Sequence, residues 1–331
     1  MNEFELIARL ARVVERPLPK GWVGIGDDCA AVPDPAGEGV TLYTCDAAVE
    51  GRHFLQGKTP WEDVGWRLAA ASVSDIAACG GAPQAALVAL NWPRQYPAED
   101  AEALYRGLAR AARDFGFQVI GGNVSSADQV VVDLFMTGRA PRLVPRGGAG
   151  PGHGLWLSGP VGDSAAGLAV LKGEPGGGPE DRAVLLHRHL RPHPRLDLAP
   201  LLAAHASAAM DISDGLAPEL GHLARASGVE LRVEGAAVPL SEELRRGWNF
   251  RGPLPQDPAF RLALYGGEDY QILFTLPVLE GKEGRKRDDL FLQAGAVEIG
   301  RVLPGERGEG RVWLDGMELP EGGGWDHLKG G

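Results

Sequence analysis

The sequence predicts a two-domain protein of mixed α/β (α+β) class. The chain has 331 residues, 44% of them hydrophobic, and a domain typically takes about 100–200 residues. Runs of strand length alternate with helical segments in both halves, which is typical of mixed α/β folds. The Gly- and Pro-rich segment 139–154 favours neither regular structure. We therefore expect one domain over residues 1–145 and a second over residues 146–331.

The first domain is predicted to begin with a helix and to continue with strands and two longer helices. In residues 1–14, apolar positions at helical spacing and charges from the first turn onward indicate a surface helix rather than a signal peptide. Thr59-Pro60-Trp61-Glu62 has the pattern of a capping box, and the helix it opens is expected to end at Gly80-Gly81. Another helix is expected from about residue 97 to 115, before Gly116. The expected strands are 40–45, 85–90, 117–120 and 130–136.

The second domain is predicted to mix strands and helices in the same way. A strand-like run at 155–159 precedes a helix candidate at 163–171. Residues 208–215 read as a strand that leads into a helix, for which Gly228 is a plausible C-cap. Residues 310–319 resemble a hairpin with Asp315-Gly316 at its turn.

The charge balance and the cysteine content exclude several classes of protein. The 33 Lys and Arg residues face 44 Asp and Glu residues, a net charge of −11, so the surface repels nucleic acids and anionic lipids. No run of 18 apolar residues predicts a membrane-spanning helix. The three cysteines form neither an even set nor a Cys-x-x-Cys pair, which favours a reducing compartment and the cytoplasm.

Aspartates are concentrated beside segments that are expected to be buried. They are Asp27, Asp28, Asp46, Asp75, Asp211 and Asp214. An acidic loop residue usually faces water, and Ser213 or Asp214 could equally cap the helix that follows. Asp211 and Asp214, three residues apart, are also expected to point to one side of an incipient helical turn.

Buried carboxylates without a positive partner are strongly disfavoured, and none of the six lysines adjoins these motifs. Carboxylates without Cys or His clusters favour magnesium, calcium or manganese. Magnesium completes its coordination with water and substrate phosphates, so the pattern points to a nucleotide phosphate.

The signals for phosphate binding and for a nucleophile are weaker. The chain has no P-loop motif and no G-x-G-x-x-G after a strand. Gly121-Gly122 and Gly266-Gly267 mark either simple turns or backbone N–H nests around a phosphate. Arg146 is either solvated or a cation over that phosphate. Because no histidine or serine motif for nucleophilic catalysis occurs, we predict no catalytic side chain.

Taken in order, the motifs resemble the thiamine-monophosphate kinases, part of a larger group that includes aminoimidazole ribonucleotide synthetase and selenophosphate synthetase. The resemblance covers nearly the whole chain. It rests on GIGDDCA (24–30), TCDAAVEGRHF (44–54), SVSDIAACG (72–80), IGGN (120–123), GDSAAGL (162–168), HLRPHPR (189–195), MDISDGL (210–216), GGEDYQILFT (266–275) and GWDH (324–327).

The resemblance implies that ATP phosphorylates thiamine monophosphate to thiamine diphosphate with the help of several Mg²⁺ ions. It implies metal ligands at Asp27, Thr44, Cys45, Asp46, Asp75, Asn123, Asp211 and Asp214. It implies ATP contacts at Tyr105, Gly122, Asn123, Arg146 and Ser213, and contacts to thiamine monophosphate at His53, Glu268 and Trp325. It also implies a homodimer in which strands of the two N-terminal domains close a barrel, with the nucleotide sites near the interface.

Two positions depart from the family pattern. Asn123 stands where the family has an aspartate, so one anionic metal ligand becomes a neutral oxygen. Cys45 replaces a threonine or serine, which puts a softer sulfur in place of a hard oxygen, although its backbone carbonyl could still bind a cation. The main acidic cluster is retained, so we expect an active enzyme.

The chemistry of the phosphate acceptor, thiamine monophosphate, determines the expected mechanism. A phosphate monoester has a second pKa of about 6 and is mostly dianionic at pH 7, so the attacking oxygen needs no general base. We expect direct in-line transfer without a phospho-enzyme intermediate. The alternatives are an ATP-using synthetase of the same group and a nucleotide-binding protein without catalysis, the second motivated by Asn123.

Overall fold

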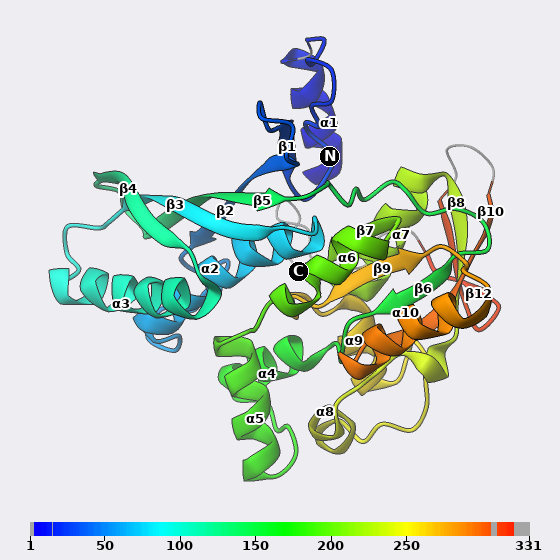
Figure 1. Cartoon of the computed structure of the whole chain (residues 1–331). Helices are drawn as coiled ribbons and strands as arrows, with labels where there is room; N and C mark the ends of the chain where they lie inside the picture. Colours follow the sequence, from blue (N-terminus) through cyan, green and yellow to red (C-terminus); the bar gives the residue numbers. More distant parts are fainter. Residues whose placement is uncertain (1–2, 15, 306–309, 321–331) are drawn as a thin grey trace.

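The computed structural model describes residues 3–14, 16–305 and 310–320, which form two α/β domains that lie side by side (Figure 1). The elements of the first half are α1 (Glu3–Val13), β1 (Ala30–Pro33), β2 (Val40–Val49), α2 (Trp61–Ala78), β3 (Ala82–Asn91), α3 (Ala98–Phe115), β4 (Gln118–Ser125) and β5 (Val131–Ala140). The predicted division at residues 145/146 falls between β5 and the first strand of the second sheet, and it stays a prediction.

The elements of the second half begin with β6 (Gly154–Leu157), α4 (Asp163–Lys172), α5 (Pro179–Leu190), α6 (Ala199–His205), β7 (Ala208–Asp211), α7 (Leu216–Ser227) and β8 (Val229–Val233). They continue with α8 (Glu242–Gly247), α9 (Pro258–Tyr265), β9 (Ile272–Leu276), α10 (Gly281–Gln293), β10 (Val297–Pro304), β11 (Arg311–Leu314) and β12 (Met317–Glu318). Among the described residues, no helix combines the length and the apolar character needed to cross a bilayer.

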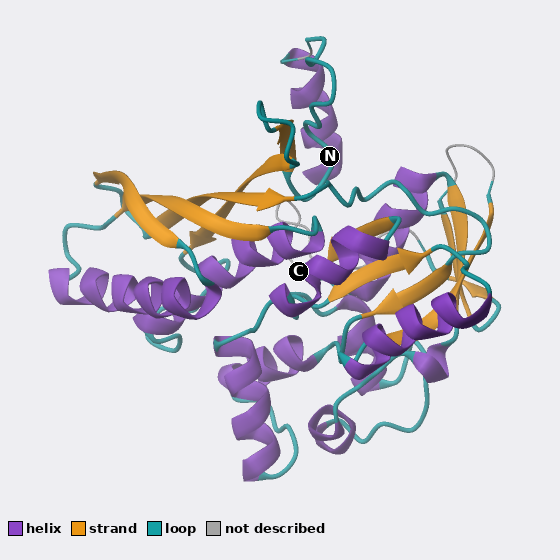
Figure 2. Ribbon diagram, viewed as in Figure 1, coloured by secondary structure: helices purple, strands orange, loops and turns teal. Residues whose placement is uncertain are grey.

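The first sheet is open, with the strand order β1-β2-β5-β3-β4 among the described residues. Its neighbouring strands are antiparallel except β3 and β4. Helix α2 packs against one face of this sheet and α3 packs against α2 (Figure 2). Because strand side chains alternate between faces, Leu134 and Met136 of β5 are buried under α2 while Phe135 is exposed on the other face.

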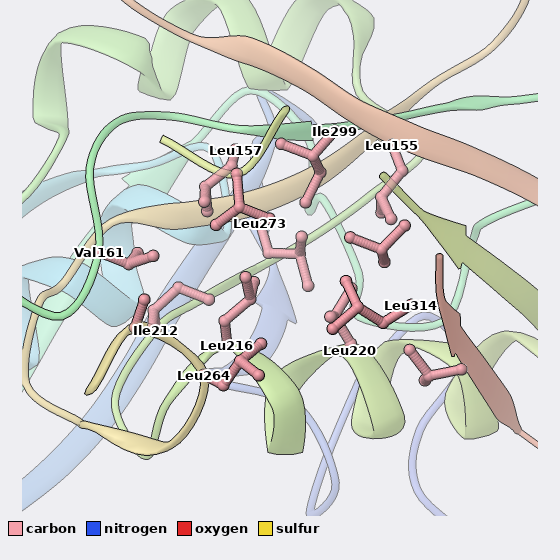
Figure 3. Close-up of a cluster of buried hydrophobic side chains, with 14 of the residues drawn as sticks. Leu155, Leu157, Val161, Ile212, Leu216, Leu220, Leu264, Leu273, Ile299 and Leu314 are labelled. Carbon is pink, nitrogen blue, oxygen red and sulfur yellow. The ribbon is translucent and has the colours of Figure 1, made fainter. Parts of the chain in front are cut away.

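The second sheet has the order β12-β11-β8-β10-β6-β9-β7 in the described part of the chain. Figure 3 shows its core, where Leu216 and Leu220 of α7 lie among side chains of the sheet such as Leu157, Leu273 and Leu314. A further buried cluster joins the two halves, because Ala77 and Ala78 at the end of α2 belong to the same cluster as Trp156 and Phe274 of the second sheet. Helix α2 is therefore packed into both domains.

Several predicted ends of elements are confirmed. Helix α3 ends before Gly116, which has the left-handed φ of 81°. Helix α7 ends before Gly228 in the same conformation, with φ of 65°. Strands β11 and β12 form the predicted hairpin, and Asp315 and Gly316 at its turn have φ of 49° and 83°.

The predicted capping box at the start of α2 is wrong. Pro60 occupies the N-cap position, and no side chain caps the helix there. The Thr59 hydroxyl instead accepts a hydrogen bond of 3.2 Å from the backbone N–H of Leu55, so it stabilises the preceding turn. Strand β4 is also longer than the predicted 117–120 and includes Gly122 and Asn123.

Candidate active site

A cavity of about 1080 Å³ lies between the two halves and receives side chains from both. The first half supplies Asp46 from β2, His53 from the turn after it, and Arg67 and Asp75 from α2. The second half supplies the segment between β7 and α7, with Asp211, Ser213 and Asp214, and the segment before β9, with Glu268 and Tyr270. Most of the predicted aspartates, far apart in the sequence, therefore line one cavity.

The carboxylates of Asp46 and Asp75 are held side by side from neighbouring elements. The Ser72 hydroxyl of α2 donates to Asp46 Oδ2 at 2.6 Å, and the Thr44 hydroxyl of β2 donates to Asp75 Oδ2. Burial raises the pKa of Asp46 to about 6. Burial, followed by the charges of Asp46 and Asp211, raises the pKa of Asp75 well above its usual value. Three acidic groups thus share one buried region, where each disfavours the charge of the others.

Asp27 and Asp28 lie at the edge of this cluster and contact the connection between the domains. The backbone N–H of Arg146 donates to Asp27 Oδ2 at 3.1 Å, and the Arg146 guanidinium pairs with Asp28. Burial and the charge of Asp28 raise the pKa of Asp27. Ligand atoms of Asp27, Asp28 and Cys79 lie within 4.8 Å of one another.

The segment that carries Asp211, Ser213 and Asp214 is ordered by a buried glutamate of α7. Glu219 Oε1 accepts the backbone N–H of Asp214 at 2.8 Å and of Ser213 at 3.2 Å, and the Ser213 hydroxyl at 3.3 Å. Burial and the nearby charge of Asp214 raise the pKa of Glu219 well above its usual value. Burial and the charge of Asp28 do the same for the pKa of Asp211.

This segment corrects two predictions about local geometry. Asp211 is the last residue of β7 and α7 begins only at Leu216, so Asp211 and Asp214 do not share a helical turn. Neither Ser213 nor Asp214 caps α7, because Gly215 occupies the N-cap position. The sequence pattern did not distinguish a helix start from the extended junction that brings both carboxylates to the cavity.

His53 and Glu268, two of the three predicted contacts to thiamine monophosphate, line the cavity. The backbone N–H of Val49 donates to His53 Nδ1 at 3.0 Å, so the ring is oriented by its own turn. Glu268 forms an ion pair of 2.6 Å with the buried Arg67. Arg67 was not predicted as a site residue, although an arginine within the otherwise apolar run of α2 was a visible signal. Trp325 lies outside the described residues.

The remaining predicted ATP and metal residues of the first domain lie apart from the carboxylates. Two strands, β5 and β3, separate β4 from β2 in the sheet. The row Asp46, Leu134, Val88, Gly122 points toward α2, whereas Asn123 belongs to the next row, which points away from it. Three strand spacings of about 4.8 Å separate Gly122 from Asp46. Tyr105 on α3 packs against the core of the first domain.

Gly122 and Cys45 have further constraints of their own. Gly122 has φ of 157°, and a Cβ there would lie 1.9 Å from the carbonyl oxygen of Val88, so only glycine fits. The Cys45 side chain follows the outward-facing row of β2. Burial and the charge of Asp46 raise the pKa of Cys45 to about 11. The protonated thiol is a poor metal ligand, so the backbone carbonyl is the better oxygen donor that this residue offers.

The donor set fits a hard divalent cation. It consists of carboxylates and hydroxyls, and the buried Asp28 Oδ2 has no hydrogen-bond partner among the described residues. A buried carboxylate oxygen without a donor is unfavourable. A cation beside Asp46, Asp75 and Asp211 would offset both their mutual repulsion and the cost of burying their charge, and oxygen ligands favour Mg²⁺ over softer metals.

Comparisons with known proteins show which proteins this chain resembles. Family models described as the N-terminal and C-terminal domains of AIR synthase related protein match residues 26–140 and 150–312. The thiamine-monophosphate kinase of Aquifex aeolicus is 38% identical over 99% of this chain and 98% of its own, and that of Salmonella typhimurium is 38% identical over 84% and 83%. A solved structure described as AaThiL complexed with AMPPCP and TMP is 37% identical, with a TM-score of 0.85 over 98% of this chain and 97% of that chain.

Proposed function

Because the chain belongs to the thiamine-monophosphate kinase family, we propose that it transfers the γ-phosphate of ATP to thiamine monophosphate and releases thiamine diphosphate and ADP. The observation that carries the proposal is the convergence of Asp46, Asp75 and Asp211 on one cavity between the domains. Its volume of about 1080 Å³ leaves room for two substrates together. A similar protein has been solved with AMPPCP and TMP.

We propose Mg²⁺ as the cofactor, held by Asp27, Asp46, Asp75, Asp211 and Asp214 with the Thr44 hydroxyl and the Cys45 carbonyl. When bound, Mg²⁺ neutralises the charge on the phosphates of ATP and of the acceptor. The support is the buried acidic donor set: burial and neighbouring carboxylates raise the pKa values of these aspartates, and a cation bound beside them would favour their charged form.

The side chains of the chain bind and orient the two substrates and do not form a covalent intermediate. The acceptor phosphate already carries the nucleophilic oxygen in its anionic form at pH 7, so no residue is assigned as general base. Glu268 offers a negative charge at the cavity wall, opposite in sign to the thiazolium ring of thiamine. We assign His53 and Trp325 to the same substrate, and Arg146 and Ser213 to the ATP phosphates.

We further propose a homodimer formed through the outer face of the first sheet, with strands of two copies closing a barrel. Exposed apolar side chains on this face support it: Tyr43, Leu87 and Phe135. Leu87 and Phe135 are neighbours in register and are 46% and 49% exposed. Contiguous apolar surface of this kind usually marks an interface. In such a dimer Tyr105, Gly122 and Asn123 would serve a nucleotide site near the interface.

We propose the cytoplasm as the location, on the same cysteine argument as above. The structure has three free thiols, Cys29, Cys45 and Cys79. A reducing compartment preserves thiols of this kind.

The proposed reaction is tested with the purified chain, ATP, MgCl₂ and thiamine monophosphate. We expect thiamine diphosphate and ADP in equal amounts, measured by chromatography and phosphorus NMR. Asp75→Asn should lower the rate at least a hundredfold, whereas the matched variant Asp289→Asn, an exposed position on α10, should leave it unchanged. ADP formation without thiamine diphosphate, or no turnover with either Mg²⁺ or Mn²⁺, would contradict the proposal.

A further inference from the structure

We propose that Arg67 is a positioning residue for thiamine monophosphate, because it joins the two described residues assigned to this substrate, one from each domain. The inference rests on the proposed function. Arg67 is only 6% exposed and lies in the helix that is packed into both domains. Its Nη2 pairs with Glu268 Oε1 at 2.6 Å and also donates to the backbone carbonyl of His53 at 3.3 Å. The other nitrogen, Nη1, donates to the backbone carbonyl of His189 at 3.2 Å.

The guanidinium also determines the charge of the groups around it. Burial opposes ionisation of Glu268, but the charge of Arg67 prevails and lowers the pKa of this carboxyl. Burial, assisted by Arg67, lowers the pKa of His189 to about 3, so its ring is neutral and contacts Nη1 of Arg67. Glu268 is therefore anionic, and its side chain is still 30% exposed toward the cavity. A negative group held in this position suits a cationic ring such as thiazolium.

The backbone around Glu268 is held independently of Arg67. The N–H groups of Glu268 and Tyr270 donate to the carbonyls of Ser213 at 2.8 Å and Ile212 at 3.0 Å. Asp269 accepts the N–H groups of Gly162 at 2.5 Å and Ser164 at 2.9 Å. These bonds retain the left-handed φ of Glu268, 66°, which non-glycine residues rarely adopt. Removal of the guanidinium is therefore expected to free the Glu268 carboxylate without displacing the segment.

The test compares Arg67→Gln and Arg67→Lys with a matched control, Arg191→Gln. Arg191 also joins α2 to the second half, through a 2.7 Å ion pair with Asp63, but is not among the residues that line the cavity. We expect Arg67→Gln to raise KM for thiamine monophosphate at least tenfold while KM for ATP stays within twofold. Arg67→Lys should recover part of the loss, and Arg191→Gln should change neither KM.

A second measurement separates positioning from a general loss of structure. Without Arg67 the pKa of Glu268 rises, so the affinity of Arg67→Gln for thiamine monophosphate, measured by calorimetry relative to wild type, should fall as the pH is lowered from 8 to 6. If Arg67→Gln does not fold, Arg67→Lys is measured in the same way. Equal changes in both KM values, or the same increase of KM for thiamine monophosphate in Arg191→Gln, would overturn the role of Arg67 but leave the proposed function standing. An inactive wild type would overturn the proposed function as well.

Discussion

At the scale of single residues, ionisation of the buried aspartates Asp46, Asp75 and Asp211 lowers the stability of the folded protein. Burial raises the folded pKa of Asp46 to about 6, and burial together with neighbouring carboxylates raises those of Asp75 and Asp211 well above their usual value. An unfolded aspartate titrates near 3.9. The folded state therefore binds more protons than the unfolded state above about pH 4, and in the absence of metal the stability falls as the pH rises from about 4 through the folded pKa values, about 6 for Asp46.

Because the metal-free protein loses stability as the pH rises, the effect of removing the metal should depend on pH. Protons and Mg²⁺ compete for the same oxygens, so MgCl₂ should raise Tm more at pH 8 than at pH 5. A ligand at 100 times its Kd adds about 2.7 kcal/mol of stability. Differential scanning calorimetry with MgCl₂ or EDTA at both pH values measures the shift. Asp75→Asn should reduce the shift and Asp289→Asn should not. A shift that is equal at the two pH values would argue that the cation binds elsewhere.

At the scale of elements, one side chain of α7 orders the segment that precedes the helix. Glu219 Oε1 accepts three hydrogen bonds from Ser213 and Asp214, while its Oε2 is buried without a partner among the described residues. Its raised pKa favours the protonated form. The segment with Ser213 and Asp214 then requires the hydrogen-bond acceptor of Glu219 and not its negative charge.

We therefore expect Glu219→Gln to retain the structure and Glu219→Leu to lose it. The glutamine carbonyl can accept the same N–H groups, so urea unfolding should give a stability within about 1 kcal/mol of wild type. Leucine leaves the partly buried N–H groups of Ser213 and Asp214 unpaired, at a cost of about 1–3 kcal/mol, and the MgCl₂ concentration for half-maximal activity should increase. If Glu219→Gln were as unstable as Glu219→Leu, the charge of Glu219 would be the essential feature.

At the scale of the whole molecule, the first sheet has one face covered by α2 and one face exposed. Cys45, Phe135 and Leu87 are neighbours in register on the exposed face, and Phe135 is 49% exposed. Side chains of this size are usually covered in a stable assembly. The same face continues to β4, where Asn123 points away from the carboxylates of its own chain.

The proposed dimer predicts the effect of a charge on this face. Wild type should sediment with twice the mass of the 35.0 kDa chain, and Phe135→Asp should shift it to the monomer mass with a large loss of ATP affinity. Leu290→Asp, at an exposed apolar position on α10, is the control and should change neither property. Sedimentation velocity over a concentration series measures the masses. A monomeric wild type at high concentration would contradict the dimer.

The sequence by itself determined the elements whose signals are local and the acidic character of the candidate site. Gly116 and Gly228 predicted two helix ends because a left-handed residue after a helix favours glycine. The aspartates predicted a cation site because buried carboxylates require positive charge. A signal of this kind lies within a few residues, so it can be read without the fold.

Tertiary structure decided which of these residues meet. Arg67 and Glu268 are 201 positions apart and pair only because α2 is packed into both domains. Glu219 can accept hydrogen bonds from Ser213 and Asp214 because α7 begins only at Leu216, so the residues between β7 and this helix are not helical. Asn123 and Asp46 point to opposite faces of the sheet because Gly122, and not Asn123, lies in register with Asp46. Register and packing depend on contacts between segments that are distant in the sequence, and the spacing of residues within one segment does not predict those contacts.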